Sequence, residues 1–243
     1  MELLIDADVT CYQAAEHAEK EIQWDEDTFS IYGDLNKAKQ SFKHKLARYQ
    51  ELTGIEPFKL CFTHGTNFRK QLNPDYKGGR KRKPVGYGAL KEWALETYPS
   101  FMRDGLEADD CLGILATKFP GRTVIVTIDK DLLTVPGKMF RLNAKGDAGE
   151  WHDTTEQEAW FRFLSQAISG DKTDGYDGIE GMGKVKADAL LKKHGAVWKT
   201  VEDAYLKAGM TAEDALMNAR MARILQAADW DFEKKEVKLW TPK

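Results

Sequence analysis

The sequence has few of the features that direct a chain into or across a membrane. No apolar run approaches the roughly 18 residues of a membrane-spanning helix. The opening segment MELLIDAD has no basic residue before its short apolar run, so we expect no secretory signal. Only three cysteines are present, Cys11, Cys61 and Cys111, and an odd count within apolar or helical stretches favours a reduced protein over a disulfide framework. We therefore expect a cytoplasmic protein with no membrane partner.

An overall excess of positive charge is also missing, because the net charge is −3. The charge is nevertheless uneven: residues 69–83 hold seven bases and one acid, Asp75, a local net charge of +6. The bases are Arg69, Lys70, Lys77, Arg80, Lys81, Arg82 and Lys83. Prolines and glycines interrupt the segment, so we expect a basic loop or arch over residues 67–84. The net charge argues only weakly against a nucleic-acid partner, because it hides this uneven distribution.

The 243 residues, 42% of them hydrophobic, suffice for one large domain or for a domain plus a smaller one. Apolar strands predicted at 3–5, 58–63 and 123–128 alternate with helices predicted near 11–18, 35–49, 88–97 and 105–119. This alternation predicts an α/β fold, a mostly parallel sheet flanked by helices. Beyond a capping box formed by Thr155 and Glu158 the pattern turns helical, with helices near 184–194 and 212–228 and a returning strand at 237–240. We predict a first domain over residues 1–154 and a helical region over 155–243.

Polar side chains with metal-binding chemistry follow each predicted strand: Asp6, His64, Asp129 and Asp131. The helix that leads into the third strand opens with three more acids: Glu107, Asp109 and Asp110. Each acid alone is most simply a turn or helix cap. Together they would meet at the carboxyl edge of a parallel sheet, where carboxylates repel one another unless a cation is bound. Carboxylate oxygens suit Mg²⁺ or Mn²⁺, and two such ions about 4 Å apart can hold the reacting oxygens of a phosphodiester.

A second signal lies in SGDKTDGYDGIEGMGKVKADALLKKHG, residues 169–195, where a glycine-rich turn opens into a helix. Backbone N–H groups at Gly181 and Gly183, with Lys184 and Lys186, would face a phosphate. The turn alone is equally well explained as a connection between helices. Two further candidate metal ligands precede it: Asp171 and Asp174.

Taken in sequence order, these segments resemble the 5′-nuclease or flap-endonuclease family, and most closely the 5′→3′ exonucleases of short-tailed bacteriophages. The resemblance rests on LLIDADVTCYQA, FRKQLNPDYKGGRKRKP, LEADD, IDKDL, GDKTDGYDGIEGMG and the C-terminal MARILQAADWDFEKKEVKLW. It covers essentially the whole chain. It implies a PIN-like nuclease domain followed by a helix–three-turn–helix DNA-binding region at about 169–195.

The resemblance also implies an activity: metal-dependent hydrolysis of DNA from 5′ ends or at flaps, and of RNA–DNA hybrids, in phage replication, primer removal and DNA degradation within the bacterial host cytoplasm. Two Mg²⁺ or Mn²⁺ ions would serve as cofactors, with a monovalent cation such as K⁺ at the glycine turn. The implied ligands are Asp6, Glu107, Asp109, Asp110, Asp129, Asp131, Asp171 and Asp174. The implied catalytic residues are Asp6, Lys77 and Arg80. The implied DNA contacts are Arg69, Lys70, Tyr76, Lys77, Arg80, Lys81, Lys83, Gly181, Gly183, Lys184 and Lys186.

One position departs from the family pattern, which usually has an aspartate just after the second strand. This chain has FTHGTNFR there, so His64, or Thr63 in an alignment shifted by one residue, replaces the acid. His64 is therefore both a candidate metal ligand and a candidate turn residue. The departure leaves open a catalytically silent protein that binds DNA junctions through the same fold. A PIN-type ribonuclease is disfavoured, because that smaller fold does not account for the glycine turn.

Overall fold

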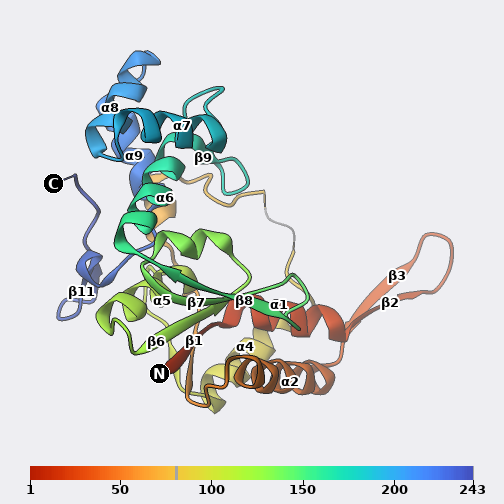
Figure 1. The fold of residues 1–243 in the computed structure, drawn as a ribbon. Coiled ribbons are helices and arrows are strands. Elements are labelled where there is room, and N and C mark those ends of the chain that lie inside the picture. Colours follow the sequence, from red (N-terminus) through yellow and green to blue (C-terminus); the bar gives the residue numbers. More distant parts are fainter. Residues whose placement is uncertain (80–81, 243) are drawn as a thin grey trace.

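The computed structural model describes residues 1–79 and 82–242, and within them the main sheet has six strands in the order β5-β4-β1-β6-β7-β8 (Figure 1). The strands are β1 (Glu2–Asp6), β4 (Phe58–Cys61), β5 (Ser100–Phe101), β6 (Thr123–Thr127), β7 (Gly137–Leu142) and β8 (Gly149–Thr154). Neighbours pair in parallel except β7 and β8, which are antiparallel. The carboxyl ends of β4, β1 and β6 therefore share one edge of the sheet.

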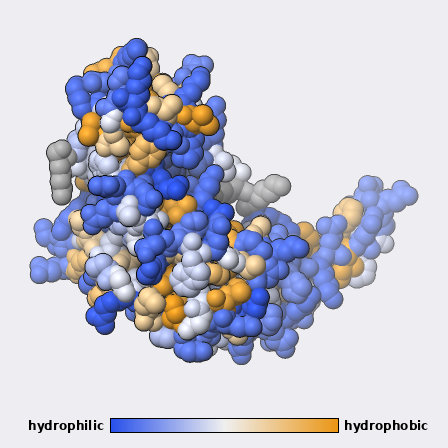
Figure 2. Space-filling view, viewed as in Figure 1, coloured by the Kyte–Doolittle hydropathy of each residue, from blue (hydrophilic) through white to orange (hydrophobic). Residues whose placement is uncertain are grey.

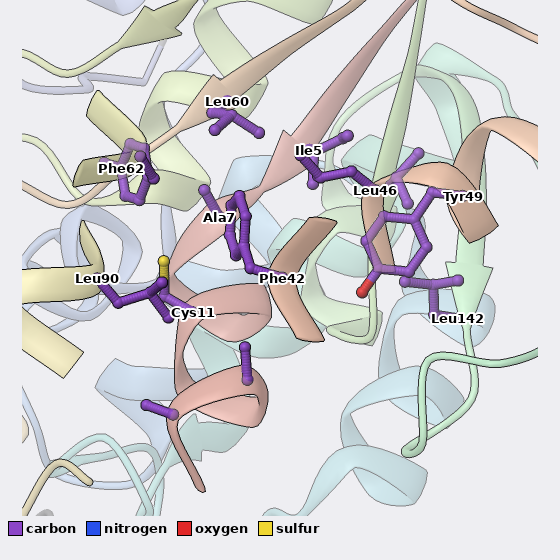
Figure 3. Packing of buried hydrophobic residues seen from close by; sticks show 14 of the residues in the cluster. Ile5, Ala7, Cys11, Phe42, Leu46, Tyr49, Leu60, Phe62, Leu90 and Leu142 are labelled. Carbon is purple, nitrogen blue, oxygen red and sulfur yellow. The ribbon is translucent and has the colours of Figure 1, made fainter. Parts of the chain in front are cut away.

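One face of the sheet packs against three helices: α1 (Ala7–Ala18), α2 (Leu35–Thr53) and α4 (Tyr87–Thr97). Side chains of a strand alternate between faces, so Leu3 and Ile5 of β1 enter this core. Phe42 and Tyr49 of α2 pack there with Ile5 (Figure 3). This core fixes the position of β1 and hence of the residue at its end.

The opposite face packs against α5 (Ala108–Lys118) and a 3₁₀ turn, η1 (Lys130–Thr134), and Leu225 joins this core just before a second 3₁₀ turn, η2 (Ala227–Asp229), which lies against α5. Leu4, the alternate residue of β1, enters this second core with Leu112 of α5. A short ribbon of β11 (Trp230–Asp231) and β12 (Glu236–Val237) adds Trp230 to it.

The C-terminal helices form a third core beside the sheet (Figure 1). They are α6 (Glu156–Ser169), α7 (Lys184–His194), α8 (Trp198–Lys207) and α9 (Ala212–Ala222). A ribbon of β9 (Gly170–Asp171) and β10 (Tyr176–Asp177) connects α6 to the glycine turn. Tyr76, from the basic segment, is buried in this third core, so that segment contacts the helical region directly.

A two-stranded ribbon of β2 (Glu19–Gln23) and β3 (Phe29–Gly33) projects from the rest of the molecule (Figure 1). It carries exposed large side chains of aromatic and aliphatic residues, and Figure 2 shows orange patches on the projection among hydrophilic residues. They are Ile22, Trp24, Phe29, Ile31 and Tyr32. The sequence analysis did not predict this ribbon.

The α/β prediction is confirmed. The predicted cap Asp34 accepts a hydrogen bond from the Lys37 amide at the start of α2, and the Thr155–Glu158 capping box starts α6. The predicted helix at 212–228 is too long, because α9 ends at Ala222.

The predicted arch begins with a short helix, α3 (Phe68–Leu72), and the predicted roles of Arg80 and Lys81 fall outside the described residues. The domain boundary at residue 154 and the helix–three-turn–helix stay predictions. No helix in the described ranges is long and apolar enough to cross a bilayer.

Candidate active site

Asp6 ends β1 and caps α1. Its Oδ1 accepts a hydrogen bond from the Val9 amide (3.2 Å), and its Oδ2 accepts one from Thr127 Oγ1 at the end of β6 (3.0 Å). Burial, and then the charge of Asp8, raise the pKa of Asp6 to about 7. A carboxylate placed where its ionised form is disfavoured is a candidate partner for a cation.

Asp129 and Asp131 follow β6. Asp129 Oδ1 accepts a hydrogen bond from the Asp131 amide (2.8 Å) and so caps η1. Burial, and then the charges of Asp129 and Asp171, raise the pKa of Asp131 to about 6. Gln166 of α6 contacts Asp131 Oδ2 at 3.3 Å. The end of β6 thus places two carboxylates close to the C-terminal helices.

Asp109 lies in the first turn of α5 and is partly buried. Burial, and then the charges of Asp6 and Asp129, hold the pKa of Asp109 well above its ordinary value. Asp6, Asp109 and Asp129 therefore lie within electrostatic reach of one another although they come from three elements.

Asp110 and Arg69 form an ion pair in the interior. Arg69 donates two hydrogen bonds to Asp110, at 2.7 Å and 2.8 Å, while the amides of Glu107 and Leu225 each donate one at 3.1 Å. All four acceptor positions of the Asp110 carboxylate are filled. Asp110 is fully buried and Arg69 is 3% exposed. The predicted roles of Asp110 as a metal ligand and Arg69 as a DNA contact do not fit this geometry, and we leave both out of the proposed site.

Glu107 accepts hydrogen bonds from three cationic or hydroxyl groups: Arg69 Nη1 (3.1 Å), Tyr76 Oη (2.9 Å) and Lys77 Nζ (2.7 Å). Burial alone would raise the pKa of Glu107, but the charges of Arg69 and then Lys77 lower it to about 2. Glu107 therefore stays ionised and holds Lys77 against the acidic edge. Tyr76 is 3% exposed, so its hydroxyl anchors Glu107, and its ring packs in the third core.

Lys77 connects the basic segment, to which it belongs, with the turn between β9 and β10. Its amide donates to the Asp174 carbonyl (2.9 Å) and its Nζ lies 3.5 Å from Asp174 Oδ2. Its backbone is left-handed (φ 57°), which costs a non-glycine residue about 1 kcal/mol. Asp171, the second predicted ligand of this ribbon, accepts bonds from the Thr173 and Asp174 amides.

The glycines around the turn serve two different purposes. A Cβ on Gly170 would lie 2.1 Å from the Gly178 amide nitrogen, so these two positions allow a close backbone approach. A Cβ on Gly181 or Gly183 would meet nothing within 4 Å, so these residues border open space at the start of α7. Two exposed lysines accompany them: Lys186 donates to the Gly181 carbonyl (2.7 Å), and Lys184 lies 3.4 Å from Asp188.

His64 pairs with Asp104, which is not one of the acids of the carboxyl edge. Its Nδ1 lies 3.0 Å from Asp104 Oδ1 and 3.1 Å from Thr66 Oγ1, and its side chain is 37% exposed. This geometry favours a turn residue over a metal ligand. The carboxylate found near the end of β4 is instead that of Asp8, which accepts a hydrogen bond from the Thr63 amide (3.1 Å). The sequence analysis missed Asp8, although its spacing of two residues from Asp6 is visible in IDADV.

A divalent metal fits this edge by its donor chemistry. The donors are carboxylate oxygens, and the pKa values of Asp6, Asp109 and Asp131 are raised first by burial and then by neighbouring carboxylates, which a bound cation would offset. Among the described residues no three acidic, histidine or cysteine side chains lie close enough to hold an ion as they stand. The fit thus rests on charge and donor type, and we assign no coordination geometry.

A mostly parallel sheet that gathers carboxylates and a lysine at its carboxyl edge, beside a basic segment and an open glycine turn, is the arrangement expected of an α/β nuclease. The chain matches the family described as 5′-3′ exonuclease, N-terminal resolvase-like domain, over residues 2–159. It is 32% identical to the exonuclease of Escherichia phage T7, covering 99% of this chain and 93% of that protein. It is 27% identical to the 5′-3′ exonuclease of Aquifex aeolicus, covering 88% and 78%. The chain therefore belongs to the 5′-3′ exonuclease family.

Solved structures agree with the fold. A mutant of the phage T5 5′-exonuclease has a TM-score of 0.66 at 14% identity, covering 92% of this chain and 87% of that one. A phage T5 flap endonuclease in a complex with DNA and metal ions also gives 0.66, at 16% identity, covering 92% and 89%.

Proposed function

We propose that this protein is a metal-dependent 5′→3′ exonuclease and flap endonuclease that cleaves duplex DNA and RNA–DNA hybrids. Primer removal and DNA degradation during phage replication, in the cytoplasm of the host cell, would be its setting. The observation that carries the proposal is the convergence of Asp6, Asp109, Asp129 and Asp131 on one edge with Lys77 beside them. The T7 exonuclease and the T5 flap endonuclease support the reaction class.

Two divalent ions, Mg²⁺ or Mn²⁺, would be held by carboxylates of this edge, and when bound they would activate water and neutralise phosphate charge. The proposed ligands are Asp6, Asp109, Asp129, Asp131, Asp171 and Asp174, with Glu107 at the margin of the set. Glu107 already accepts bonds from Arg69, Tyr76 and Lys77, so its main role here is to position Lys77.

Lys77 would bind the scissile phosphate. Its ammonium group is held against Glu107 and near Asp174, and it can donate a hydrogen bond to a phosphate oxygen placed over the acids. Arg80, three residues further along the basic segment, would assist it. Each hydrogen bond donated to developing charge stabilises the transition state more than the bound substrate.

DNA would be held on both sides of the acids. Lys70 and Lys83 are exposed in the basic segment, to which Lys81 also belongs, and Lys184 and Lys186 flank the glycine turn. The open backbone at Gly181 and Gly183 would face a DNA phosphate, with a K⁺ ion as the bridging cation. These contacts carry no sequence information, which suits an enzyme that acts at ends and flaps.

The test is a cleavage assay on 5′- and 3′-labelled duplex, nicked, flapped and RNA–DNA substrates, with Mg²⁺, Mn²⁺ or EDTA. Metal-dependent release of short products from the 5′ side is expected. Tight flap binding without cleavage in either metal would instead identify a silent junction-binding protein.

Lys77→Ala should lower turnover at saturating DNA by about 10²–10³-fold, the usual cost of removing one donor to transition-state charge. Glu107 keeps its bonds to Arg69 and Tyr76, so the fold should survive. Single-turnover rates measure the effect, with Lys70→Ala, an exposed lysine of the same segment, as the matched control. Weaker DNA binding with unchanged single-turnover rates would contradict a catalytic role.

The neighbouring bases should act through long-range charge. Neutralising Lys81 and Lys83 together should weaken DNA binding. It should also make the plot of log binding constant against log salt concentration less steep, by about 0.9 for each phosphate that the variant no longer neutralises. Fluorescence anisotropy of a labelled flap over a series of KCl concentrations would give the slope. Lys138→Ala, which removes a lysine at the amino-terminal end of β7, should leave the slope unchanged. If Lys138→Ala changed the slope as much as the double variant does, DNA binding would depend on the total charge of the protein and not on the position of these lysines.

A further inference from the structure

Asp8 lies in the first turn of α1, two residues after Asp6, and three groups fix its carboxylate. Tyr87 Oη donates to its Oδ1 (2.8 Å), and the Thr63 amide donates to its Oδ2 (3.1 Å). Lys91 Nζ lies 3.7 Å from Oδ1 and itself donates to the Thr63 carbonyl. Tyr87 and Lys91 are one turn apart on α4, so one helix face supports this carboxylate from the side.

The position of Asp8 brings a negative charge from α1 to the end of β4. β4 pairs in parallel with β1, with Cys61 opposite Asp6, so residue 63 lies just beyond the edge at which Asp6 is placed. Asp8 is thus part of the same acidic group.

The residues that follow β4 carry no such charge to this edge. Thr63 Oγ1 accepts a hydrogen bond from the Ala108 amide (3.0 Å) and so serves the start of α5. His64 is turned to Asp104 and Thr66. The carboxylate of Asp8, delivered from α1, is therefore the acidic group that occupies the end of β4.

Asp8 also retains the capacity to bind a cation. Its two oxygens accept one hydrogen bond each, so one acceptor position remains on each. Asp110 differs, because its four acceptor positions are filled. Lys91 forms an ion pair with Asp8 at 3.7 Å, beyond hydrogen-bond distance, so it fills neither remaining acceptor position.

We propose that Asp8 is a further carboxylate of the divalent-metal site, held in place by Tyr87 and the Thr63 amide. It contributes the oxygen and negative charge that the residues after β4 do not provide. The assignment rests on the proposed metal-dependent function and adds to it a ligand, Asp8, and a positioning residue, Tyr87.

Direct measurement of Mn²⁺ binding tests this without any reaction. The full chain is titrated with Mn²⁺ in the absence of DNA, and free Mn²⁺ is followed by electron paramagnetic resonance. Asp8→Asn keeps the size and one acceptor oxygen but removes the charge, and we expect an Mn²⁺ affinity weaker by about tenfold or more, or the loss of one bound ion. Asp104→Asn, which removes the exposed acid beside His64, should bind Mn²⁺ as the wild-type protein does.

Tyr87→Phe gives a second, milder variant, since it keeps the Asp8 charge and removes one anchor. An affinity between those of wild type and Asp8→Asn is expected, because supporting residues of metal ligands usually matter by about tenfold or more. The metal-free melting temperature of Asp8→Asn should equal or exceed that of wild type, since repulsion with Asp6 is relieved.

Two outcomes overturn the assignment and differ from each other. Wild-type Mn²⁺ affinity in Asp8→Asn, whether or not its melting temperature falls, would make Asp8 a structural anchor for β4 and α4 only. Absence of Mn²⁺ binding by the wild-type protein would overturn the proposed metal-dependent function itself.

Discussion

Asp129→Asn is expected to reduce the cleavage rate at saturating DNA and Mg²⁺ by at least about 100-fold, equivalent to roughly 2.7 kcal/mol in the activation barrier. Asp129 follows a fully buried strand and its charge contributes to the raised pKa of Asp109 and Asp131. Asparagine keeps the oxygen that caps η1, so the effect reports charge and metal binding and not a broken turn.

The control for this prediction lies at the opposite edge of the sheet. Asp153→Asn removes an exposed carboxylate of β8 that pairs with Lys138 near the start of β7. This variant should cleave at the wild-type rate. Thermal unfolding in EDTA should show Asp129→Asn to be no less stable than wild type, because a repelling charge is removed. More than about a tenth of wild-type activity in Asp129→Asn would exclude Asp129 as a ligand, since it corresponds to less than about 1.4 kcal/mol in the barrier.

Arg69→Met is expected to destabilise the protein by about 3–5 kcal/mol, the usual cost of leaving a buried charge without its partner. Arg69 donates two hydrogen bonds to Asp110, one to Glu107, one to the Met221 carbonyl and one to the Arg223 carbonyl. It therefore joins α3 and α5 to the end of α9, and its removal affects both the sheet domain and the helical region. Urea denaturation followed by circular dichroism measures the effect.

A double variant distinguishes a broken charge pair from poor packing. If the uncompensated Asp110 carboxylate is the main cost, Arg69→Met with Asp110→Leu should recover a large part of the stability, because both buried charges are then removed. Lys70→Met, next to Arg69 but exposed, should change stability by less than about 0.5 kcal/mol. If the double variant is no more stable than Arg69→Met, the lost stability would come from the two hydrogen bonds that Arg69 donates to backbone carbonyls.

The sequence was most informative where a local rule decides the outcome. The β-branched run of β6 and the cap at Asp34 depend on neighbours within a few residues, and both were predicted correctly. The expectation that the acids share the carboxyl edge came from topology, and it stays a prediction. The strands β7 and β8 were missed, since their alternation is weak and their pairing depends on a hairpin between exposed residues.

The roles of individual acids could not be inferred from spacing. Glu107, Asp109 and Asp110 look equivalent in LEADD, yet Asp110 points into the interior toward Arg69, a residue 41 positions earlier in a segment whose charge suggests DNA binding. The pKa of Asp109 is instead raised by burial and then by the charges of Asp6 and Asp129. Only the fold decides which acid meets a cationic side chain, because the partner comes from a distant segment.

The projecting β2–β3 ribbon affects how the protein behaves in concentrated solution. Two paired strands with open edges and exposed Trp24, Phe29 and Tyr32 are a template for pairing with another chain. Three acids at the tip, Asp25, Glu26 and Asp27, oppose such contacts by repulsion between molecules. At 0.1 M salt the screening length is about 10 Å, so added salt weakens this repulsion and favours self-association. The same salt also weakens the binding of DNA to the protein. Colloidal stability and DNA affinity should therefore both decline as ionic strength rises, the first through acids and the second through bases of the same molecule.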